Sequence, residues 1–472
     1  MELFLDPDDS RPLSTQLYEQ LRTAIVEGRL EPGARLTPSR TAAADLGVAR
    51  ATVTDAYGRL SAEGYVEGRS GGGSVVSAAP AHVRTRVSVP ALAPTERAAA
   101  IAAYDPAPGA RAAFDFRPGR LDPALFPVAA WRRCVVRTLD RAPGQYEDPA
   151  GTPELRETLA HWVARSRGVS ATAEETFVTS GAGHAVDLIA RVLAEPGTTV
   201  AVEEPGYPPV VAVLRSHGLR VVGVPVDDHG IVVEAIPAES RIVYVTPSHQ
   251  YPLGMVMARR RRLELLDWAA RAGAAVIEDD YDSEFRHTVR PLEPMQRLDR
   301  DGRVIYVGTF SKSLSPALRI GFLVAPATLI PALRAVRQAV DWCPPPATQQ
   351  ALTHFIADGH LDRHLRRSRR RYTDRHRLMR EALDRFLPSG YHVLPAEAGL
   401  HLTVTGPADA ADAELWPALR QQGLQVSSLR YTYAFDEPRS GFLLGFAALP
   451  EQSVGPAVRG LSAALAASAH HR

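Results

Sequence analysis

One primary amine stands apart in a chain that otherwise carries its positive charge on arginine. Lys312 is the only lysine among 472 residues. An arginine is never deprotonated in a protein, whereas a lysine of lowered pKa can attack a carbonyl and form a Schiff base. Pyridoxal phosphate (PLP) is the commonest cofactor for that chemistry. Thr309, Ser311 and Arg319 surround the lysine with hydroxyls and a guanidinium suited to a phosphate, which a lysine left by codon bias would not explain.

Two further segments supply what a phosphorylated ring needs. Thr179-Ser-Gly-Ala-Gly-His184 follows an expected strand and opens an expected helix. The free amides at such a turn attract phosphate, and Ala182 and Gly183 are the expected donors. Glu204-Pro-Gly-Tyr-Pro208 comes next, and its Tyr207 is either a flat group that stacks on the ring or an ordinary core tyrosine.

A carboxylate is expected beneath the ring. Glu278-Asp-Asp-Tyr281 ends an apolar strand candidate. A carboxylate there can keep a pyridine nitrogen protonated, so that the ring acts as an electron sink.

These segments resemble a known family. Ser311-Lys-Ser-Leu-Ser-Pro-Ala-Leu-Arg-Ile-Gly321 is similar to the cofactor-lysine motif of fold-type I aminotransferases. Over nearly its full length, the chain resembles the MocR/GabR-type transcriptional regulators. These proteins fuse a GntR-type winged helix to an aminotransferase-like domain.

The resemblance assigns roles to single residues. It implies that Asp279 is the acid at the ring nitrogen, with Glu278 as the alternative, and that Tyr281 hydrogen-bonds the phenolic oxygen of the cofactor. His249 is expected to contact the cofactor. Arg430 is expected to hold the carboxylate of an amino compound, and the alternative is a surface arginine.

One segment departs from the enzyme pattern. Thr246-Pro-Ser-His-Gln-Tyr-Pro-Leu-Gly254 stands where aminotransferases commonly carry an asparagine for the phenolic oxygen, and Tyr251 occupies that place. The departure favours a regulator over an efficient transaminase.

Three helices and a hairpin are predicted at the N terminus. Apolar residues four apart predict a helix over residues 13–28. A second helix is expected over 39–46 with Ser39 as its N-cap, a third over 48–60, and a hairpin over 65–76. This order is that of a winged helix-turn-helix. Its resemblance to the GntR-type reader names the expected DNA contacts as Arg40, Arg50, Ala51, Thr52 and Gly71.

The charge of this segment is not basic overall. Residues 1–80 contain eight arginines and eleven acidic residues, although a DNA-binding domain usually has a basic footprint. Four arginines fall within the helix-turn-helix and wing, and several acids precede it. A helix-turn-helix used for protein contact remains an alternative. Nine arginines within residues 363–380 are either a solvated helix face or a groove for DNA backbone.

Length and pattern predict several domains. We expect a winged helix over residues 1–77, an Ala- and Pro-rich linker over 78–112, and an aminotransferase-like domain over 113–472 with a smaller lobe from about 345. Strand and helix signals alternate in the third part, which predicts an α/β fold with a mostly parallel sheet. The expected strands are 177–179, 199–203, 220–226, 242–246, 274–278, 304–307 and 320–325.

Composition limits the cellular compartments and the kinds of metal site that can be expected. Two distant cysteines and histidines without metal-ligand spacing predict neither a disulfide framework nor a zinc site. No apolar run reaches the length of a membrane span, and the N terminus does not resemble a signal peptide. We expect a cytoplasmic protein.

The sequence therefore predicts a PLP-dependent transcriptional regulator. Its winged helix binds operator DNA, and its aminotransferase-like domain binds PLP on Lys312 and senses PLP, an amino compound or both. The resemblance implies a head-to-tail homodimer. The alternative is an active aminotransferase with an accessory DNA-binding domain.

Overall fold

The structure is a computed structural model that describes residues 3–69, 73–77, 92–102, 112–140, 144–287, 293–407 and 412–469. The chain forms two compact units, Met1–Ala93 and Pro94–Arg472, and we describe each by itself. Within the described residues, no helix is long and apolar enough to cross a membrane.

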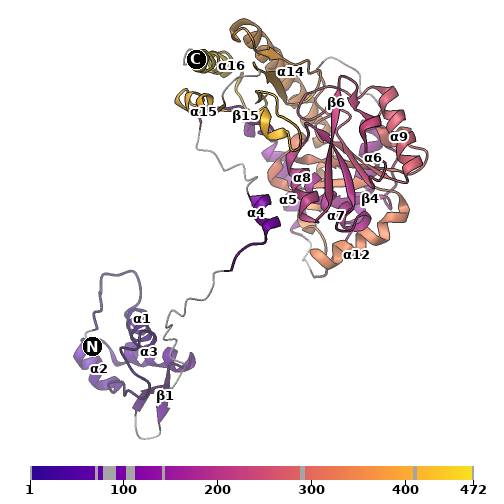
Figure 1. Cartoon of the computed structure of the whole chain (residues 1–472). Helices are drawn as coiled ribbons and strands as arrows, with labels where there is room; N and C mark the ends of the chain where they lie inside the picture. Colours follow the sequence, from indigo (N-terminus) through magenta and orange to yellow (C-terminus); the bar gives the residue numbers. More distant parts are fainter. Residues whose placement is uncertain are drawn as a thin grey trace. The chain divides into compact units, whose positions relative to one another are not determined.

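The first unit is a three-helix cluster with a β hairpin (Figure 1). Leu17, Leu21, Val53 and Leu60 are buried at its centre, as the four-residue apolar spacing requires for helices that share a core. The elements are α1 (Leu13–Val26), α2 (Ser39–Leu46), α3 (Arg50–Ala62), β1 (Val66–Arg69) and β2 (Gly73–Val76), and β1 pairs antiparallel with β2.

The ends of α2 differ in part from the prediction. Ser39 is the first helical residue, while Pro38 occupies the N-cap without a side-chain hydrogen bond. Proline suits this end because its missing N–H would lack an intrahelical partner there. At the other end Gly47 adopts φ 66°, the left-handed conformation that glycine tolerates. The expected N-cap role of Ser39 was therefore wrong, and the expected end of the helix was right.

The second unit is built on a mostly parallel sheet with helices on both sides (Figure 1). Its strand order is β4-β11-β10-β9-β8-β5-β6-β7, with β11 antiparallel to both β4 and β10. Each expected strand overlaps an observed one. The strands are β4 (Thr176–Thr179), β5 (Thr199–Glu204), β6 (Arg220–Asp227), β7 (Gly230–Ile231), β8 (Ile242–Val245), β9 (Ala275–Asp280), β10 (Val304–Thr309) and β11 (Gly321–Val324).

Alternate residues of the central strands enter separate cores. Val200 and Val202 of β5 pack with helices on one face, and Ala201 between them packs on the other. Because both faces are covered, the strands read as continuous apolar runs. The helices of this unit are α4 (Glu96–Ala102), α5 (Val128–Thr138), α6 (Pro153–Arg167), α7 (Ala182–Leu193), α8 (Pro208–Ser216), α9 (Arg259–Ala272), α10 (Met295–Leu298), α11 (Phe310–Ser313), α12 (Ile330–Val340), α13 (Pro346–Ala357), α14 (His360–Phe386), α15 (Asp412–Gln421) and α16 (Glu451–Ala469).

A smaller sheet lies in the C-terminal part of the chain. Its order is β12-β13-β16-β15, from β12 (His392–Val393), β13 (His401–Thr405), β15 (Ser427–Ser428) and β16 (Gly441–Gly445). A two-stranded pair joins β3 (Phe114–Asp115) to β14 (Leu424–Gln425).

The segment expected to be a linker contains a helix. The run Glu96-Arg-Ala-Ala-Ala-Ile-Ala102 forms α4, which agrees with the high helix propensity of alanine. The Arg97 guanidinium donates a hydrogen bond to the Ser216 carbonyl at the end of α8. This part of residues 78–112 therefore packs on the second unit.

Candidate functional site

Lys312 lies where β10 meets the short helix α11. The Thr309 hydroxyl caps that helix by accepting a hydrogen bond from the Ser311 amide at 3.2 Å, and it donates one to the Ser311 hydroxyl at 3.1 Å. Burial lowers the pKa of the Lys312 ammonium, and the carboxylates of Asp282 and Asp279 partly offset that effect. Desolvation thus favours the neutral amine that a carbonyl requires.

A loop residue missed by the sequence analysis covers this amine. A Cβ added to Gly119 would lie 2.7 Å from the Lys312 Nζ, and the φ of Gly119 is +83°. The backbone conformation therefore favours glycine, and a larger residue would also displace the end of the Lys312 side chain. A lone glycine in a loop gives no signal of this kind in the sequence.

Asp279 is buried at the end of β9 with one oxygen satisfied. Its Oδ2 accepts a hydrogen bond from the Tyr244 hydroxyl at 2.6 Å. Its Oδ1 is buried and has no partner among the described residues. Burial raises the pKa of the Asp279 carboxyl to about 7, against the lowering effect of the Tyr244 hydrogen bond. Such an oxygen is a binding position for an N–H donor or a cation.

Glu278 has a different use. Its two oxygens accept the backbone N–H groups of Met295 at 2.8 Å and Gln296 at 2.9 Å, which fixes the start of α10. Neighbouring residues of a strand point to opposite faces, so Glu278 and Asp279 serve different sides of the sheet. Both oxygens of Glu278 are thus occupied by backbone donors, whereas Asp279 Oδ1 has no partner among the described residues.

An anion cradle forms at the start of α7. Ala182 and Gly183 open this helix, so their amides have no intrahelical carbonyl to bind. A Cβ added to Gly183 would meet nothing within 4 Å, and one added to Gly181 would lie 3.4 Å from Arg319 Nη2. Free amides, the helix dipole and a guanidinium thus converge there.

The backbone of Arg319 is strained. Its φ is 50°, directly after the 3-10 turn Pro316–Leu318. A residue with a Cβ pays about 1–2 kcal/mol in this region. This strained conformation directs the Arg319 guanidinium to the start of α7.

Tyr281 lies in a buried polar group with His249 and Asp282. Its hydroxyl lies 2.8 Å from His249 Nδ1, and both carboxylate oxygens of Asp282 lie 3.1 Å from the same nitrogen. His401 completes this buried group with its ring centre 5.1 Å from that of His249. Burial, followed by the proximity of His249, lowers the pKa of His401 to about 4. The sequence analysis missed Asp282 and His401.

Aromatic rings continue from this group towards the start of α8. The Tyr251 ring lies edge-on to the rings of Tyr207, with centres 5.2 Å apart, and of Tyr281, with centres 6.3 Å apart. The structure therefore brings these three predicted residues together.

Arg430 lies on the 3-10 turn Leu429–Thr432, with an exposed side chain. The chain just beyond it is fixed to the segment that carries Tyr207. Gly206 N–H donates to the Thr432 carbonyl, and Glu204 Oε1 accepts the amide of Ala434 at 2.7 Å. These contacts hold the turn beside the Glu204–Tyr207 segment.

Comparisons with known proteins agree with this geometry. Residues 122–461 match the family Aminotransferase class I and II, and residues 13–76 match the bacterial regulatory proteins of the gntR family. The chain is 37% identical to the probable rhizopine catabolism regulatory protein MocR of Rhizobium meliloti, over 98% of this chain and 96% of that protein. The chain belongs to the MocR-type transcriptional regulators.

Two further relatives of this MocR-type chain are informative. The pyridoxine biosynthesis regulator PdxR of Corynebacterium glutamicum is 31% identical over 96% of each chain. The kynurenine aminotransferase of Pyrococcus horikoshii, solved in complex with PMP, has a TM-score of 0.71 and 27% identity, covering 80% of this chain and 95% of that one.

The DNA-reading unit of this MocR-type regulator presents the predicted residues at two helix starts. Arg50 and Ala51 are exposed at the start of α3, with Thr52 half-buried beside them. Arg40 is exposed on α2, and Arg50 Nε lies 3.4 Å from the Ser39 hydroxyl. Gly71 lies outside the described residues. The start of the second helix of such a motif is the part that reads base edges.

Proposed function

We propose that this MocR-type regulator binds PLP covalently through the amine of Lys312 and uses the occupied site to control operator binding. When bound, PLP supplies an aldehyde for the amine and a protonated ring nitrogen. The single observation that carries the proposal is the buried Asp279 Oδ1, which has no partner among the described residues. A pyridinium N–H is the donor that this oxygen needs.

The other residues match the remaining parts of the cofactor. The amides of Ala182 and Gly183, the Arg319 guanidinium and the hydroxyls of Thr309 and Ser311 would hold the phosphate.

The rings of Tyr207 and Tyr251 would border the pyridine. Tyr281 would face its phenolic oxygen if its hydroxyl turned from His249, which would keep its contact with the Asp282 carboxylate.

The effector is PLP itself, an amino compound or both. Arg430 would bind the carboxylate of an amino compound as a two-pronged donor. The names of two relatives, a rhizopine catabolism regulator and a pyridoxine biosynthesis regulator, suggest genes of vitamin B6 or of amine and amino-acid metabolism as targets.

The whole protein would be a cytoplasmic homodimer with head-to-tail protomers. Residues 1–77 would bind operator DNA, and residues 113–472 would bind the effector. Residues 78–112 would link these two domains. A dimer places two recognition helices on two half-sites.

Physiological transamination is the alternative. Lys312, Asp279 and Arg430 are all present in this chain. Tyr251 in place of an asparagine argues for slow turnover, so we propose that the site acts mainly as a sensor. Release of a keto acid at a rate comparable with an aminotransferase would support the alternative.

The test is borohydride reduction of the PLP-loaded full chain followed by peptide mapping. We expect the reduced cofactor on the peptide that contains Lys312. Lys312→Arg should keep the circular dichroism spectrum of the wild type and lose the fixed cofactor, because a guanidinium cannot attack the aldehyde. Reduced cofactor on another peptide, or fixation in the variant, would contradict the proposal.

A further inference from the structure

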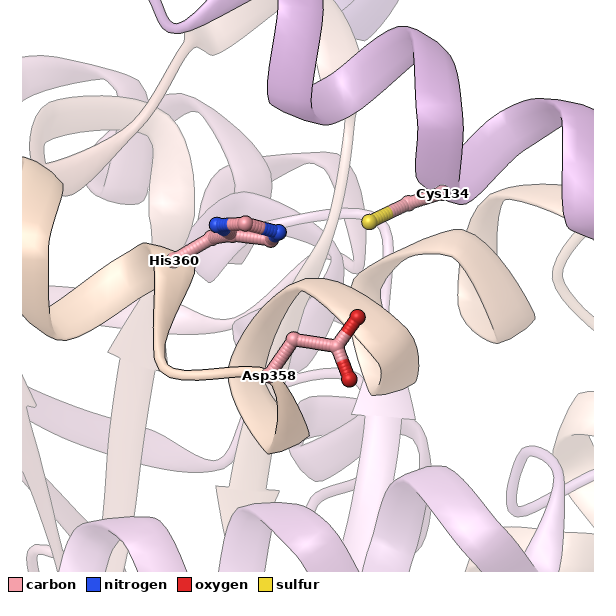
Figure 2. Close-up of side chains that lie close together, drawn as sticks. All are labelled: Cys134, Asp358 and His360. Carbon is pink, nitrogen blue, oxygen red and sulfur yellow. The ribbon is translucent and has the colours of Figure 1, made fainter.

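Three potential metal ligands come from helix α5 and from the junction of helices α13 and α14. Cys134, Asp358 and His360 place a sulfur, a carboxylate oxygen and an imidazole nitrogen within 4.8 Å of one another. Figure 2 shows a ring nitrogen of His360 directed at the Cys134 sulfur and the Asp358 carboxylate directed towards the space between them. Cys134 is buried, His360 half-buried and Asp358 exposed, so solvent reaches the group from one side.

The backbone fixes these three residues. Asp358 is the C-cap residue that follows α13, Gly359 adopts φ 68°, and His360 begins α14, so Asp358 and His360 stand on either side of one tight turn. Cys134 lies on α5, which packs on α13 through the edge-to-face pair of Trp131 and Phe355, with ring centres 5.6 Å apart. The Phe355 ring also lies 5.5 Å from the His360 ring. The cluster therefore rests on packed helices.

We propose that Cys134, Asp358 and His360 form a binding site for a late first-row divalent cation, Zn²⁺ foremost, with solvent as the fourth ligand. Thiolate, imidazole and carboxylate together suit zinc, whereas Mg²⁺ and Ca²⁺ prefer oxygen ligands alone. Bond lengths of about 2.0–2.3 Å place two tetrahedral zinc ligands about 3.3–3.8 Å apart. Ligand atoms already within 4.8 Å need only a movement of about 1 Å.

A reactive-thiol role fits the same residues less well. Burial raises the pKa of the Cys134 thiol, with a further contribution from Asp358, and burial lowers the pKa of His360, with a further contribution from Arg363. The thiol and the imidazole are thus both driven to their neutral forms, the opposite of an activated thiolate–imidazolium pair. A metal ion reverses this preference because it binds the thiolate and releases the thiol proton to solvent.

Two arginines would compete with the metal. Arg137 Nη1 lies 2.8 Å from Asp358 Oδ2, and Arg363 Nη2 lies 2.6 Å from His360 Nδ1. Both guanidiniums are exposed, so each can turn into solvent at little cost. Removal of the Arg137 guanidinium should therefore strengthen metal binding by releasing the carboxylate.

The first test is titration of the reduced full chain with Co²⁺, whose visible bands report tetrahedral coordination and a cobalt–thiolate bond. We expect one equivalent to produce these bands, and Cys134→Ser to abolish them. Cys343→Ser is the matched control because Cys343 is the other cysteine of the chain, and it should leave the bands unchanged. Absent bands, or bands that persist in Cys134→Ser, would overturn the proposal.

The second test is equilibrium dialysis against Zn²⁺, because Cys134 is buried and its serine variant could misfold. His360→Gln, at a half-buried position, should lower zinc affinity by at least about tenfold, as the loss of even an outer metal contact does. Arg137→Gln should raise the affinity, a gain that misfolding cannot produce. Equal zinc retention by the wild type and both variants would mean adventitious binding only and would overturn the proposal.

Discussion

Asp279 and Asp280 are neighbours in the sequence, and their environments shift the pKa values of their carboxyls in opposite directions. Asp280 accepts hydrogen bonds from Arg167 at 2.7 Å and Tyr306 at 2.6 Å, and the Arg167 charge holds the pKa of its carboxyl below the usual range despite its burial. Asp279 has a hydroxyl partner and no cation of equal proximity among the described residues, and burial raises its pKa to about 7. Strand alternation causes the difference because it sends the two side chains to opposite faces.

A pH dependence of the cofactor-free protein follows from Asp279. The ordinary pKa of its carboxyl is 3.8, and burial in the fold raises that pKa to about 7. Between these values the folded state binds more protons than the unfolded state, so the free energy of unfolding falls as the pH rises. Asp279→Asn cannot ionise and should lose less stability than the wild type from pH 4 to pH 7, as measured by denaturant unfolding.

Asp280→Asn is the matched control for that measurement. The lowered pKa of Asp280 stabilises the fold above pH 3.8, and this contribution is lost as the pH falls through the folded pKa. The loss of unfolding free energy in Asp280→Asn, relative to the wild type, should therefore be largest at neutral pH. Parallel pH profiles for the two variants would contradict the assignment. Added PLP should flatten the wild-type profile because a cationic ring nitrogen favours ionised Asp279.

At the scale of the element, helices α3 and α14 present arginines in two different ways. Arg50 stands at the first position of α3, where a recognition helix meets base edges. On α14, Arg363, Arg366, Arg367, Arg370 and Arg371 line one hollow of the surface. Arg371 pairs with Glu451, whereas no carboxylate of the described residues pairs with Arg366, Arg367 or Arg370. The first arrangement suits base readout and the second suits phosphate contacts.

Arg50→Ala should weaken binding to the operator by about 1–3 kcal/mol and relax its sequence specificity. The measurement is fluorescence anisotropy with operator and scrambled duplexes. Arg22→Ala is the control, because Arg22 is exposed on α1 and bonds the Tyr65 hydroxyl. If both variants bind with equal affinity, the recognition assignment of α3 is wrong.

Replacement of Arg366, Arg367 and Arg370 by alanine should weaken binding to all long duplexes alike. For each phosphate that the variant no longer neutralises, the slope of log affinity against log salt should fall by about 0.9. Arg377→Ala serves as the control because Arg377, also exposed on α14, is paired with Glu381. An unchanged slope in the triple variant would identify these arginines as an ordinary solvated face.

At the scale of the whole molecule, a ligand can control DNA binding only if it prefers one conformation of the protein. Arg430 and the Tyr207 segment lie on separate parts of the second unit that contact each other through Gly206 and Thr432. A ligand held between Arg430 and Lys312 would draw these parts together, and lobe closure of this kind commonly accompanies ligand binding. Such a closure controls transcription only if it changes how the DNA-reading unit binds the operator.

We therefore expect the effective amino compound to change the cofactor absorption and the operator affinity over the same range of concentration, with little keto acid released. Titration of the PLP-loaded protein on labelled operator measures both. Arg430→Ala should weaken the two responses together and leave PLP binding intact. A full absorption change without any change in operator affinity or DNA bending would show that the site does not act as a sensor.

The sequence by itself determined the two-part organisation and the mostly parallel sheet, and it singled out Lys312 as the candidate amine. These features follow from local spacing, from apolar runs and from a residue type that occurs once. Tertiary structure decided that Arg167 pairs with Asp280, whereas Asp279 accepts a hydrogen bond from the Tyr244 hydroxyl, because these partners lie far along the chain. It also brought Cys134 to Asp358 and His360, although spacing had predicted no zinc site. Such contacts depend on helix packing, which leaves no periodic signal in the chain.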